Sequence, residues 1–443
     1  MKKKKIVLFV FLLVGVLSLV LTYKLKQNNL SNNKPVKEEK LSIMIKEDGA
    51  TDYTKSSSKD IPKGNYVLNE EKTHCENNGQ IISYDNVNGV VGFSFIGSDK
   101  CYLYFDYYFP TRKAYDAILL DNGNGVTTVD EAKAYISGKG TPTFTDSATS
   151  NDGMYSTKDD LGMSYYFRGA VDNNWLKFGE VDGESIYWRI IRINGDGSIR
   201  LLYTGTTAPT ESQKVVMTGT GTQISTSAFN NSARSSEYVG YKYEIGKQHG
   251  LAKDSDIKTT LENWYKTTTL YIDETASKLV VDTPFCYDRT ASTSETGTYG
   301  EISNWASTGT TYNYGSYGRI WGNKTEPSLK CANELDKYSV ANKALSYPVG
   351  LITADEINMA GADNNHTSNS SYYLYTGQAY WSGSPNGFSG YSNFSGVFRV
   401  YSSGDLRNGD VNLNYGVRGS VSLSSEAKLS GDGTWNNPYI VES

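Results

Sequence analysis

The chain has 443 residues, including 43 glycines and 35 tyrosines, and a formal net charge of −5. The first 40 residues contain nine lysines and two glutamates, a charge of +7, which leaves −12 for the rest of the chain. This acidity argues against nucleic acids and anionic wall polymers as partners, because both are polyanions. The length leaves room for two or three domains of about 150 residues each.

The N-terminus predicts a membrane segment. Lysines occupy positions 2–5, and an unbroken apolar run begins at Ile6 and ends at Leu21. Such a segment lies in a membrane with its lysines on the cytoplasmic side, so the chain beyond about Lys24 is expected outside the cytoplasm. Residues 1–26 are therefore predicted to form a cytoplasmic block and a membrane anchor. The membrane is the first predicted partner.

Two fates of this segment are open. Its 16 residues lie near the lower limit of roughly 17 for a spanning helix and exceed the usual signal-peptide core of about 7–15. The sequence from Leu21 to Lys24 lacks the small-x-small pattern that a signal peptidase reads, which favours an uncleaved signal anchor. Cleavage followed by secretion is the alternative. A lipoprotein anchor is excluded because the first cysteine is Cys75.

The four cysteines predict disulfides, because an even number outside the cytoplasm is typical of them. Pairing of sequence neighbours, Cys75 with Cys101 and Cys286 with Cys331, is the simplest of three connectivities. Free buried thiols are the alternative. The chain has no C-x-x-C spacing, so neither zinc binding nor thioredoxin-like chemistry is indicated.

The first part of the exterior chain divides by composition. Residues 27–61 are rich in Asn, Lys, Ser and Glu and predict a solvated stalk. Residues 62–110 predict a small β module, with strands at 89–95 and 101–105 and a hairpin turn at Asn88-Gly89. The alternative is that these strands belong to the main domain.

Residues 111–163 predict a connector with short helices. Helical pattern runs from Ala114 to Ile136, with a helix start near Thr128. The segment 121–125 (DNGNG) is similar to a calcium loop, but Gly123 stands where an EF-hand requires Asp or Asn. An Asn-Gly turn is therefore the favoured interpretation.

Residues 164–443 predict an α+β domain. Apolar runs at 186–193 and 198–203 flank an Asn-Gly-Asp-Gly turn and predict a hairpin. Alternation in the first run predicts a half-buried strand in which Trp188 and Arg189 are structural. Residues 255–271 predict a helix, and 351–357 a strand running into a helix with Thr353 as its N-cap. Short terminal strands are expected at 397–400 and 416–423.

Five motifs of this domain occur in a recognisable order: residues 164–171 (SYYFRGAV), 187–192 (YWRIIR), 347–356 (YPVGLITADE), 380–382 (YWS) and 416–418 (GVR). Together they resemble a large, poorly characterised family of membrane-anchored surface proteins from gut Gram-positive bacteria. The resemblance covers about residues 165–442. The order is also similar, more remotely, to the C-type-lectin-like fold shared with formylglycine-generating enzymes. The chain departs from the family at Gly419, where a proline is usual, which implies a looser turn into the last strand.

The chemistry-bearing residues do not indicate an enzyme. The formylglycine-generating reaction needs reactive cysteines, and the cysteines here are better explained as disulfides. The sugar-binding motifs of true C-type lectins are absent, and 326–328 (EPS) and 435–437 (WNN) only approach them. The three histidines, His74, His249 and His366, lack metal-ligand spacing and an adjacent nucleophile, so surface positions are expected. No metal and no cofactor is predicted.

One aromatic cluster is the candidate binding site. Rings and amides gather between positions 372 and 393 among glycines and serines, and such groups suit a glycan or a peptide. Residues 386–391 are glycine-rich and are expected to form a surface loop that exposes two of the rings. The favoured alternative is that half of these rings simply form the core of a sheet, because strand alternation alone would bury Tyr373, Tyr375 and Trp381 on one side or the other. The candidate ligand-binding residues are Tyr373, Tyr375, Tyr380, Trp381, Asn386, Phe388, Tyr391 and Asn393.

The sequence therefore predicts a membrane-anchored extracellular protein that binds a glycan or a cell-surface partner without catalysis. Its expected fold is α+β, with an N-terminal membrane helix, a small β module and a lectin-like C-terminal domain. A structural or pilus-associated surface component without a ligand pocket is the second hypothesis, and an enzyme is the third.

Overall fold

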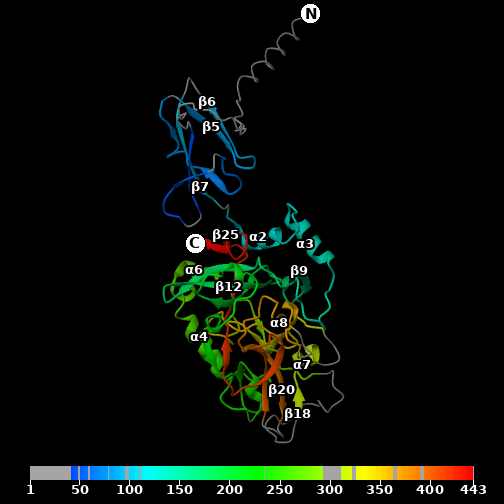
Figure 1. Cartoon of the computed structure of the whole chain (residues 1–443). Helices are drawn as coiled ribbons and strands as arrows, with labels where there is room; N and C mark the ends of the chain where they lie inside the picture. The colour runs from blue at the N-terminus through cyan, green and yellow to red at the C-terminus, as the bar shows by residue number, and fades with distance from the viewer. Residues whose placement is uncertain are drawn as a thin grey trace, which may run out of the picture. The chain divides into compact units, whose positions relative to one another are not determined.

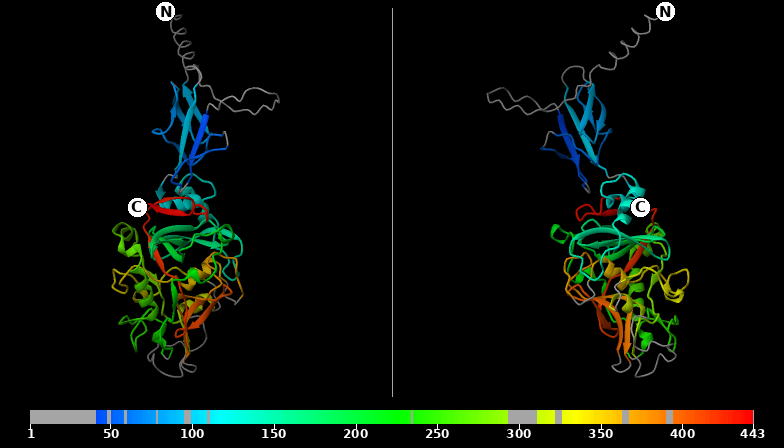
Figure 2. Two further views of the ribbon diagram at one scale, coloured as in Figure 1. Left: turned by 60° about the vertical axis from the view of Figure 1, so that its left-hand side comes forward. Right: turned by 90° about the vertical axis from the view of Figure 1, so that its right-hand side faces the viewer.

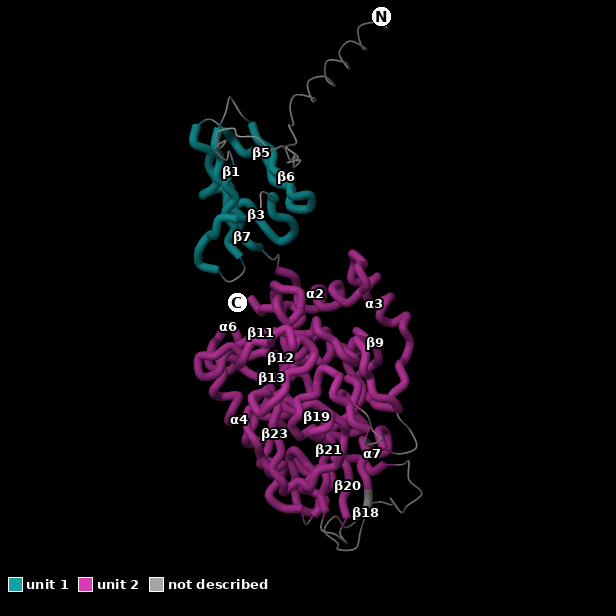
Figure 3. Tube along the Cα trace, viewed as in Figure 1, with its two compact units in different colours: residues 1–110 teal, residues 111–443 magenta. Residues whose placement is uncertain are grey.

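The computed structural model describes residues 41–47, 50–57, 60–77, 79–94, 99–108, 111–233, 235–292, 311–321, 326–362, 367–389 and 394–442. The chain divides into two compact units, residues 1–110 and 111–443 (Figure 3). The predicted anchor lies outside the described residues. Within the described ranges, no helix has both the length and the apolar character needed to cross a membrane.

Unit 1 is built from short strands around a small core of Ile43, Val91, Leu103 and Phe105. Its main sheet has the order β2-β1-β7-β3, β4 pairs with β7, and β5 and β6 form a separate hairpin. The strand β1 runs parallel to β7, with Leu41 opposite Cys101. The strands are β1 (Leu41–Lys46), β2 (Thr54–Lys55), β3 (Tyr66–Leu68), β4 (His74–Cys75), β5 (Gln80–Asp85), β6 (Val90–Ser94) and β7 (Cys101–Tyr107).

Two expected boundaries are wrong. The predicted stalk at 27–61 contains β1 and β2, which belong to the sheet of unit 1, so the β module begins at Leu41. The predicted connector at 111–163 belongs to unit 2, because Ala117, Ile118 and Ile136 lie in its main core. The polar composition of residues 41–61 concealed two strands: β1, whose partner β7 follows much later in the chain, and β2, which pairs with β1.

Unit 2 is a mixed α+β structure, as expected. Its larger sheet has the order β24-β13-β12-β11-β26-β25-β8, and β10 joins β12 to β9. The predicted hairpin is confirmed, with Ile193 opposite Ile199 in an antiparallel pair. The strands are β8 (Arg112–Lys113), β9 (Asn151–Lys158), β10 (Met163–Gly169), β11 (Trp175–Val181), β12 (Glu184–Ile193), β13 (Ile199–Gly205), β24 (Ser420–Leu423), β25 (Lys428–Ser430) and β26 (Tyr439–Glu442).

A second sheet of unit 2 has the order β14-β23-β20-β21-β22, with β18 paired to β20. The strands near β12 and those near β20 form separate sheets, and α8 lies between them (Figures 1 and 2). The strands are β14 (Ser225–Ser227), β18 (Thr311–Asn313), β20 (Tyr380–Ser389), β21 (Phe394–Val400), β22 (Leu406–Asp410) and β23 (Tyr415–Val417). Two small pairs are β15 (Lys242–Tyr243) with β16 (Lys253–Asp254), and β17 (Phe285–Cys286) with β19 (Lys337–Tyr338).

The N-cap residues in the sequence predicted the starts of two helices correctly. Both α3 and α8 begin with a capping box, in which the N-cap residues Thr128 and Thr353 exchange hydrogen bonds with Glu131 and Glu356. Residues 351–353 are not a strand, however, and the expected helix at 255–271 is divided. The α-helices are α2 (Ala114–Asp121), α3 (Val129–Gly138), α4 (Asp256–Tyr265), α5 (Thr269–Ile272), α6 (Glu274–Leu279), α7 (Gly315–Ile320) and α8 (Ala354–Ala360).

The strand β12 is buried on both faces from Trp188 to Ile193, so the expectation of a half-buried strand is wrong. Trp188 packs edge-on against Trp264 of α4 and donates its indole N–H to the Phe178 carbonyl at 2.8 Å. On the opposite face, the guanidinium of Arg189 lies 4.2 Å above the ring of Trp175. Side chains from β11 and α4 therefore pack on residues that alternation placed on opposite faces of the strand.

Gly419 replaces the proline expected from the family resemblance, and packing explains the small residue. A Cβ atom at this position would lie 2.8 Å from the indole ring of Trp264 and 3.2 Å from Leu261. The shorter contact requires the indole ring of Trp264 to shift. Gly419 therefore allows α4 to pack closely against the chain before β24.

Trp188→Ala should lower the free energy of unfolding of unit 2 by roughly 3–5 kcal/mol, because it deletes a side chain that is 0% exposed. All seven tryptophans lie at position 175 or later, so tryptophan fluorescence during urea unfolding follows unit 2 alone. Tyr135→Ala on α3, where the side chain is 42% exposed, is the control and should change little. An unchanged unfolding midpoint for Trp188→Ala would show that the indole is not part of the stabilising core.

Candidate functional site

The candidate site is a charged cavity in unit 2, with a volume of about 70 Å³. Its wall comes from the ends of the β12–β13 hairpin, the turn after β9, the start of α8, and the segments around the Cys286–Cys331 disulfide. The charged residues that line it are Asp159, Asp160, Arg192, Arg200, Asp288, Arg319, Lys330, Lys337, Asp355 and Glu356.

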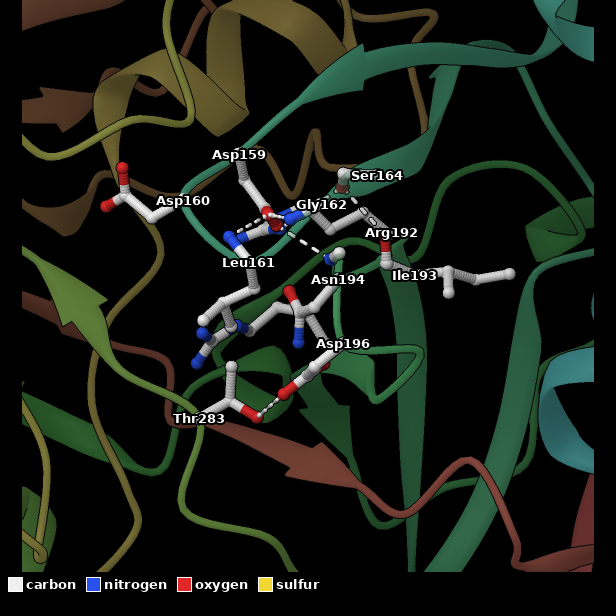
Figure 4. Close-up of polar contacts among 12 residues, drawn as sticks. Asp159, Asp160, Leu161, Gly162, Ser164, Arg192, Ile193, Asn194, Asp196 and Thr283 are labelled. Atoms are coloured by element: carbon white, nitrogen blue, oxygen red, sulfur yellow. Dashed lines mark hydrogen bonds and ion pairs between the residues drawn. The ribbon is translucent and has the colours of Figure 1, made fainter.

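Arg192 of β12 is the centre of the first ion-pair group. Its Nη1 lies 2.8 Å from Asp159 Oδ2, and its Nε lies 2.8 Å from Glu356 Oε1. Asp159 also accepts hydrogen bonds from the backbone N–H groups of Leu161, Gly162 and Gly195 (Figure 4). The side chain of Asp159 therefore accepts four hydrogen bonds, which use its lone pairs fully.

Glu356 is held ionised by the same arginine. Burial alone would raise the pKa of Glu356, but the charges of Arg192 and Arg200 and the Thr353 N–H outweigh burial, so the pKa lies below its usual range. The second oxygen, Oε2, accepts from the N–H of Thr353 at 2.8 Å as half of the capping box. One carboxylate thus starts α8 and joins that helix to β12.

Arg319 of α7 forms a second group of the same kind. Its Nη1 lies 2.8 Å from Asp288 Oδ2, and its Nε lies 2.8 Å from Asp355 Oδ1. The Asp355 Oδ1 atom also accepts from the backbone N–H of Ser328 at 2.9 Å. Two arginines therefore each bridge two carboxylates, and no carboxylate in these groups is free to take a proton from a substrate.

Arg200 of β13 differs from both. It is 1% exposed, its Nη2 donates to the Pro284 carbonyl at 2.8 Å, and its guanidinium lies 3.9 Å above the ring of Phe285. Its Nε and Nη1 have no hydrogen-bond partner among the described residues. Burial lowers the pKa of Arg200 to about 10, although Glu356 acts in the opposite direction. The side chain therefore stays charged at neutral pH.

The Cys286–Cys331 disulfide forms part of the cavity wall and confirms the predicted pairing, as does the Cys75–Cys101 disulfide in unit 1. The chain has no free cysteine. Next to the bridge, Asp160 accepts from the Cys331 N–H at 3.1 Å and pairs with Lys337 at 3.1 Å. The disulfide and this ion pair hold the two segments of the rim together.

The aromatic residues predicted to bind a ligand are mostly buried. Tyr373, Tyr380, Trp381 and Asn386 lie in the interior, Tyr375 is partly buried, and Phe388 is only 3% exposed. Tyr391 and Asn393 lie outside the described residues. The expected surface loop at 386–391 is wrong as far as Ser389, because β20 continues to that residue and pairs with β18 and β21.

The glycines that suggested a loop serve close packing instead. A Cβ on Gly383 of β20 would lie 2.0 Å from the ring of Tyr287, and one on Gly396 of β21 would lie 2.4 Å from the ring of Phe394. Glycine in a strand interior often marks such an approach. The buried tyrosines act as packing partners for arginines, since Arg418 lies 4.8 Å above Tyr380 and Arg189 lies 5.3 Å above Tyr373.

His249 is also more enclosed than the expected surface histidine. Its Nδ1 lies 2.9 Å from Asp336 Oδ2, and its Nε2 lies 3.3 Å from the Asn333 amide. Asp336 in turn accepts from Arg289 Nε at 2.7 Å. Both ring nitrogens of His249 therefore have a protein partner.

Sequence reasoning missed the arginines and carboxylates of the cavity. A signal was present, because Arg189, Arg192 and Arg200 each stand inside an otherwise apolar run, where a charge must be buried with a partner. Glu356, the partner of Arg192, lies too far along the chain to be assigned from spacing, and so do Asp288 and Asp355, the partners of Arg319.

Comparisons of the chain with protein-family models, with curated proteins and with solved structures give no match. The resemblance to the surface-protein family and to the lectin-like fold therefore stays a prediction. Among the described residues, no group of three or more His, Cys, Asp or Glu side chains could hold a metal ion.

Replacing Cys286 and Cys331 together by alanine should lower the free energy of unfolding of unit 2 by about 2–4 kcal/mol, because the bridge closes a sequence separation of 45 residues. Tryptophan fluorescence again measures this unit alone. The matched control replaces Cys75 and Cys101, in unit 1, and should leave the fluorescence midpoint unchanged. An equal midpoint for both double variants would contradict a stabilising role of the Cys286–Cys331 bridge.

Glu356→Gln should destabilise unit 2 by about 3–5 kcal/mol at neutral pH, because it breaks a buried pair with Arg192. The pKa of Glu356 is lower in the folded protein than in the unfolded chain, where it is about 4.5. The stabilisation by its carboxylate is therefore complete above about pH 4.5 and is lost as the pH falls through the folded pKa. The difference in the free energy of unfolding between wild type and Glu356→Gln should therefore become smaller below about pH 4.5.

Urea unfolding followed by fluorescence at several pH values measures this difference. Glu274→Gln is the control, because its carboxylate pairs with Lys278 on the exposed surface of α6 and should contribute less than about 1 kcal/mol. If this difference in the free energy of unfolding became larger as the pH falls, Glu356 would not be an ionised, salt-bridged carboxylate in the folded protein.

Proposed function

We propose that this chain is a membrane-anchored protein of the cell exterior whose unit 2 binds a glycan or a cell-surface partner without catalysis. The observation that carries the proposal is the charged cavity, in which four of the carboxylates are already fixed by two bridging arginines. A preorganised and ionised wall of this kind suits binding, because it needs little rearrangement when a ligand enters.

The location rests on two features. The cationic block before the apolar run from Ile6 to Leu21 has the pattern of a signal anchor. The two disulfides, one in each unit, are consistent with an oxidising compartment outside the cytoplasm. Secretion after cleavage is the variant of this proposal in which the anchor is removed.

The proposal of binding without catalysis rests on the state of the acidic groups. A general acid or base needs a group that can exchange a proton near the working pH and can reach the substrate. Asp159 accepts four hydrogen bonds and Asp355 accepts three, and Glu356 has a lowered pKa. These carboxylates position arginines and backbone segments.

A structural surface component is the second candidate. The burial of Tyr380, Trp381 and Phe388 favours it, because those rings were the predicted ligand platform and they form core packing instead. This candidate predicts assembly with other surface proteins and no affinity for glycans.

A glycan array probed with the purified full-length chain should separate the two candidates. Binding to a defined set of glycans is the expected result, and Lys330→Met should reduce the signal because it removes an exposed cation from the cavity lining. Arg407→Met is the matched control, since Arg407 pairs with Asp405 outside the cavity lining. A blank array with correctly folded protein would favour the structural component. Protease accessibility of unit 2 on intact cells tests the location.

A further inference from the structure

Unit 1 has a hollow of its own, with a volume of about 430 Å³. This volume lies within the range of about 300–1,000 Å³ that is typical of small-molecule sites. The hollow lies on the outer face of the main sheet: along β7, Leu103 and Phe105 are buried in the core, whereas Tyr104 and Asp106 point the other way and are partly exposed. Its lining includes Lys46, Glu47, Tyr53, Asn69, Lys72 and Asp106, all of them partly or fully exposed.

Three polar side chains of the hollow are fixed by one another. The Tyr53 hydroxyl donates to Asp106 Oδ1 at 2.6 Å, and Asn69 Nδ2 donates to Asp106 Oδ2 at 2.7 Å. The same Asn69 nitrogen lies 3.0 Å from the Tyr53 hydroxyl oxygen. The Tyr53 ring packs edge-on against Tyr104, with 5.0 Å between the ring centroids. A carboxylate, an amide and a hydroxyl are therefore held in place before a ligand enters, which lowers the entropy cost of binding.

Two lysines line the same hollow. The ammonium group of Lys72 lies 4.5 Å above the ring of Tyr53, and Lys46 stands opposite Asp106 in the parallel pair of β1 with β7. Burial alone would raise the pKa of Asp106, but the hydrogen bonds from Tyr53 and Asn69 and the charges of the two lysines outweigh burial, so the pKa lies below its usual range. The Asp106 carboxylate is therefore ionised at neutral pH.

The charges of the lining balance. Glu47 is the second carboxylate, and it accepts from the Tyr66 hydroxyl at 2.7 Å. The hollow is thus lined by two ammonium groups and two carboxylates and is formally neutral. An anion would be repelled by both carboxylates and a cation by both lysines. A neutral ligand meets neither repulsion.

The lining also requires a ligand that is polar throughout. The ammonium groups only donate hydrogen bonds, the carboxylates only accept them, and the amide of Asn69 does both. Of the residues that line the hollow, Ala50 alone lacks a polar side-chain group, so an apolar ligand would strip these groups of water without replacing it. A hydroxyl group both donates and accepts, so a ligand rich in hydroxyls can pair with all of them.

We infer that this hollow of unit 1 binds a neutral sugar. Its hydroxyl groups accept from the two lysines and donate to the two carboxylates, and the Tyr53–Asp106–Asn69 group supplies the rigid part of the site. The site goes beyond the proposed function, because it is formed by residues of unit 1 alone and does not depend on the charged cavity of unit 2.

The glycan array, probed with the full-length chain as wild type, Lys46→Met and Lys72→Met, tests the inference. Methionine keeps an unbranched side chain of similar shape but removes the ammonium group, so the packing of the lysine stem is largely retained. Each variant should raise the concentration of chain needed for half-maximal signal on neutral glycans by about tenfold, because it removes one charged hydrogen-bond donor. Lys63→Met is the matched control and should behave as wild type, since Lys63 is exposed in unit 1 outside the lining.

A third variant separates lost donors from a lost fold. Lys72→Arg keeps a cation with several donors at the same position and should retain most of the signal on neutral glycans. An unchanged signal in both methionine variants would overturn the inference. Lysine-dependent binding of acidic glycans alone, or displacement of the bound neutral glycans by an excess of the zwitterion glycine, would also overturn it, because either result assigns a charged ligand to the hollow.

The Lys330→Met variant separates failure of this inference from failure of the proposed function. A signal that Lys46→Met and Lys72→Met weaken and Lys330→Met leaves unchanged would retain the sugar site of unit 1 and reject glycan binding by the cavity of unit 2. The reverse pattern would retain the proposed function and overturn the inference. A blank array would reject both.

Discussion

Unit 2 depends on hydrogen bonds that buried arginines donate to the carbonyl groups of its loops. Much of this unit is neither helix nor strand, yet its loops run through the interior, where each carbonyl needs a donor. Arg168 alone donates to the carbonyls of Asn358, Met359, Thr143 and Asp146. Arg418 donates to those of Tyr203 and Leu374. One guanidinium can donate to several carbonyls. A few arginines therefore satisfy buried carbonyls that hydrogen bonds within helices and sheets would satisfy elsewhere.

The charge of these arginines imposes a second constraint, because an ion moved from water into the interior loses several kcal/mol of solvation. The chain offsets this loss with aromatic rings and carboxylates. Arg189 lies above Trp175 and near Tyr373, and burial lowers its pKa to about 9, which still leaves it charged at neutral pH. Arg192 and Arg319 use paired carboxylates instead. Tyr373 and Tyr380 therefore serve the interior, where the sequence analysis considered them as part of a binding surface.

The parts of the fold that were predictable from sequence depend on neighbours along the chain. The β12–β13 hairpin needs only alternating apolar residues and a turn, and the capping box of Thr353 and Glu356 spans three residues. The continuation of β20 to Ser389 was not predictable, because its glycines suggested a loop, whereas the reason for Gly383 is the ring of Tyr287, almost a hundred positions earlier in the sequence. The cavity was missed for the same reason. Its ion pairs join residues such as Arg192 and Glu356 that no local pattern relates.

The hydrogen bonds of the buried arginines also bear on the choice of the cavity as the candidate site. The buried arginines of unit 2 lie among rings, carbonyls or carboxylates, and Arg189 and Arg289 each have one guanidinium nitrogen without a partner among the described residues. Arg200 has its ring, Phe285, and one carbonyl, Pro284, but it has donors to spare. A rigid interior cannot easily rotate a carbonyl toward it, because β13 and the disulfide hold both sides of the cavity in place. The fold thus fixes Arg200 beside carboxylates that are already held by Arg192 and Arg319.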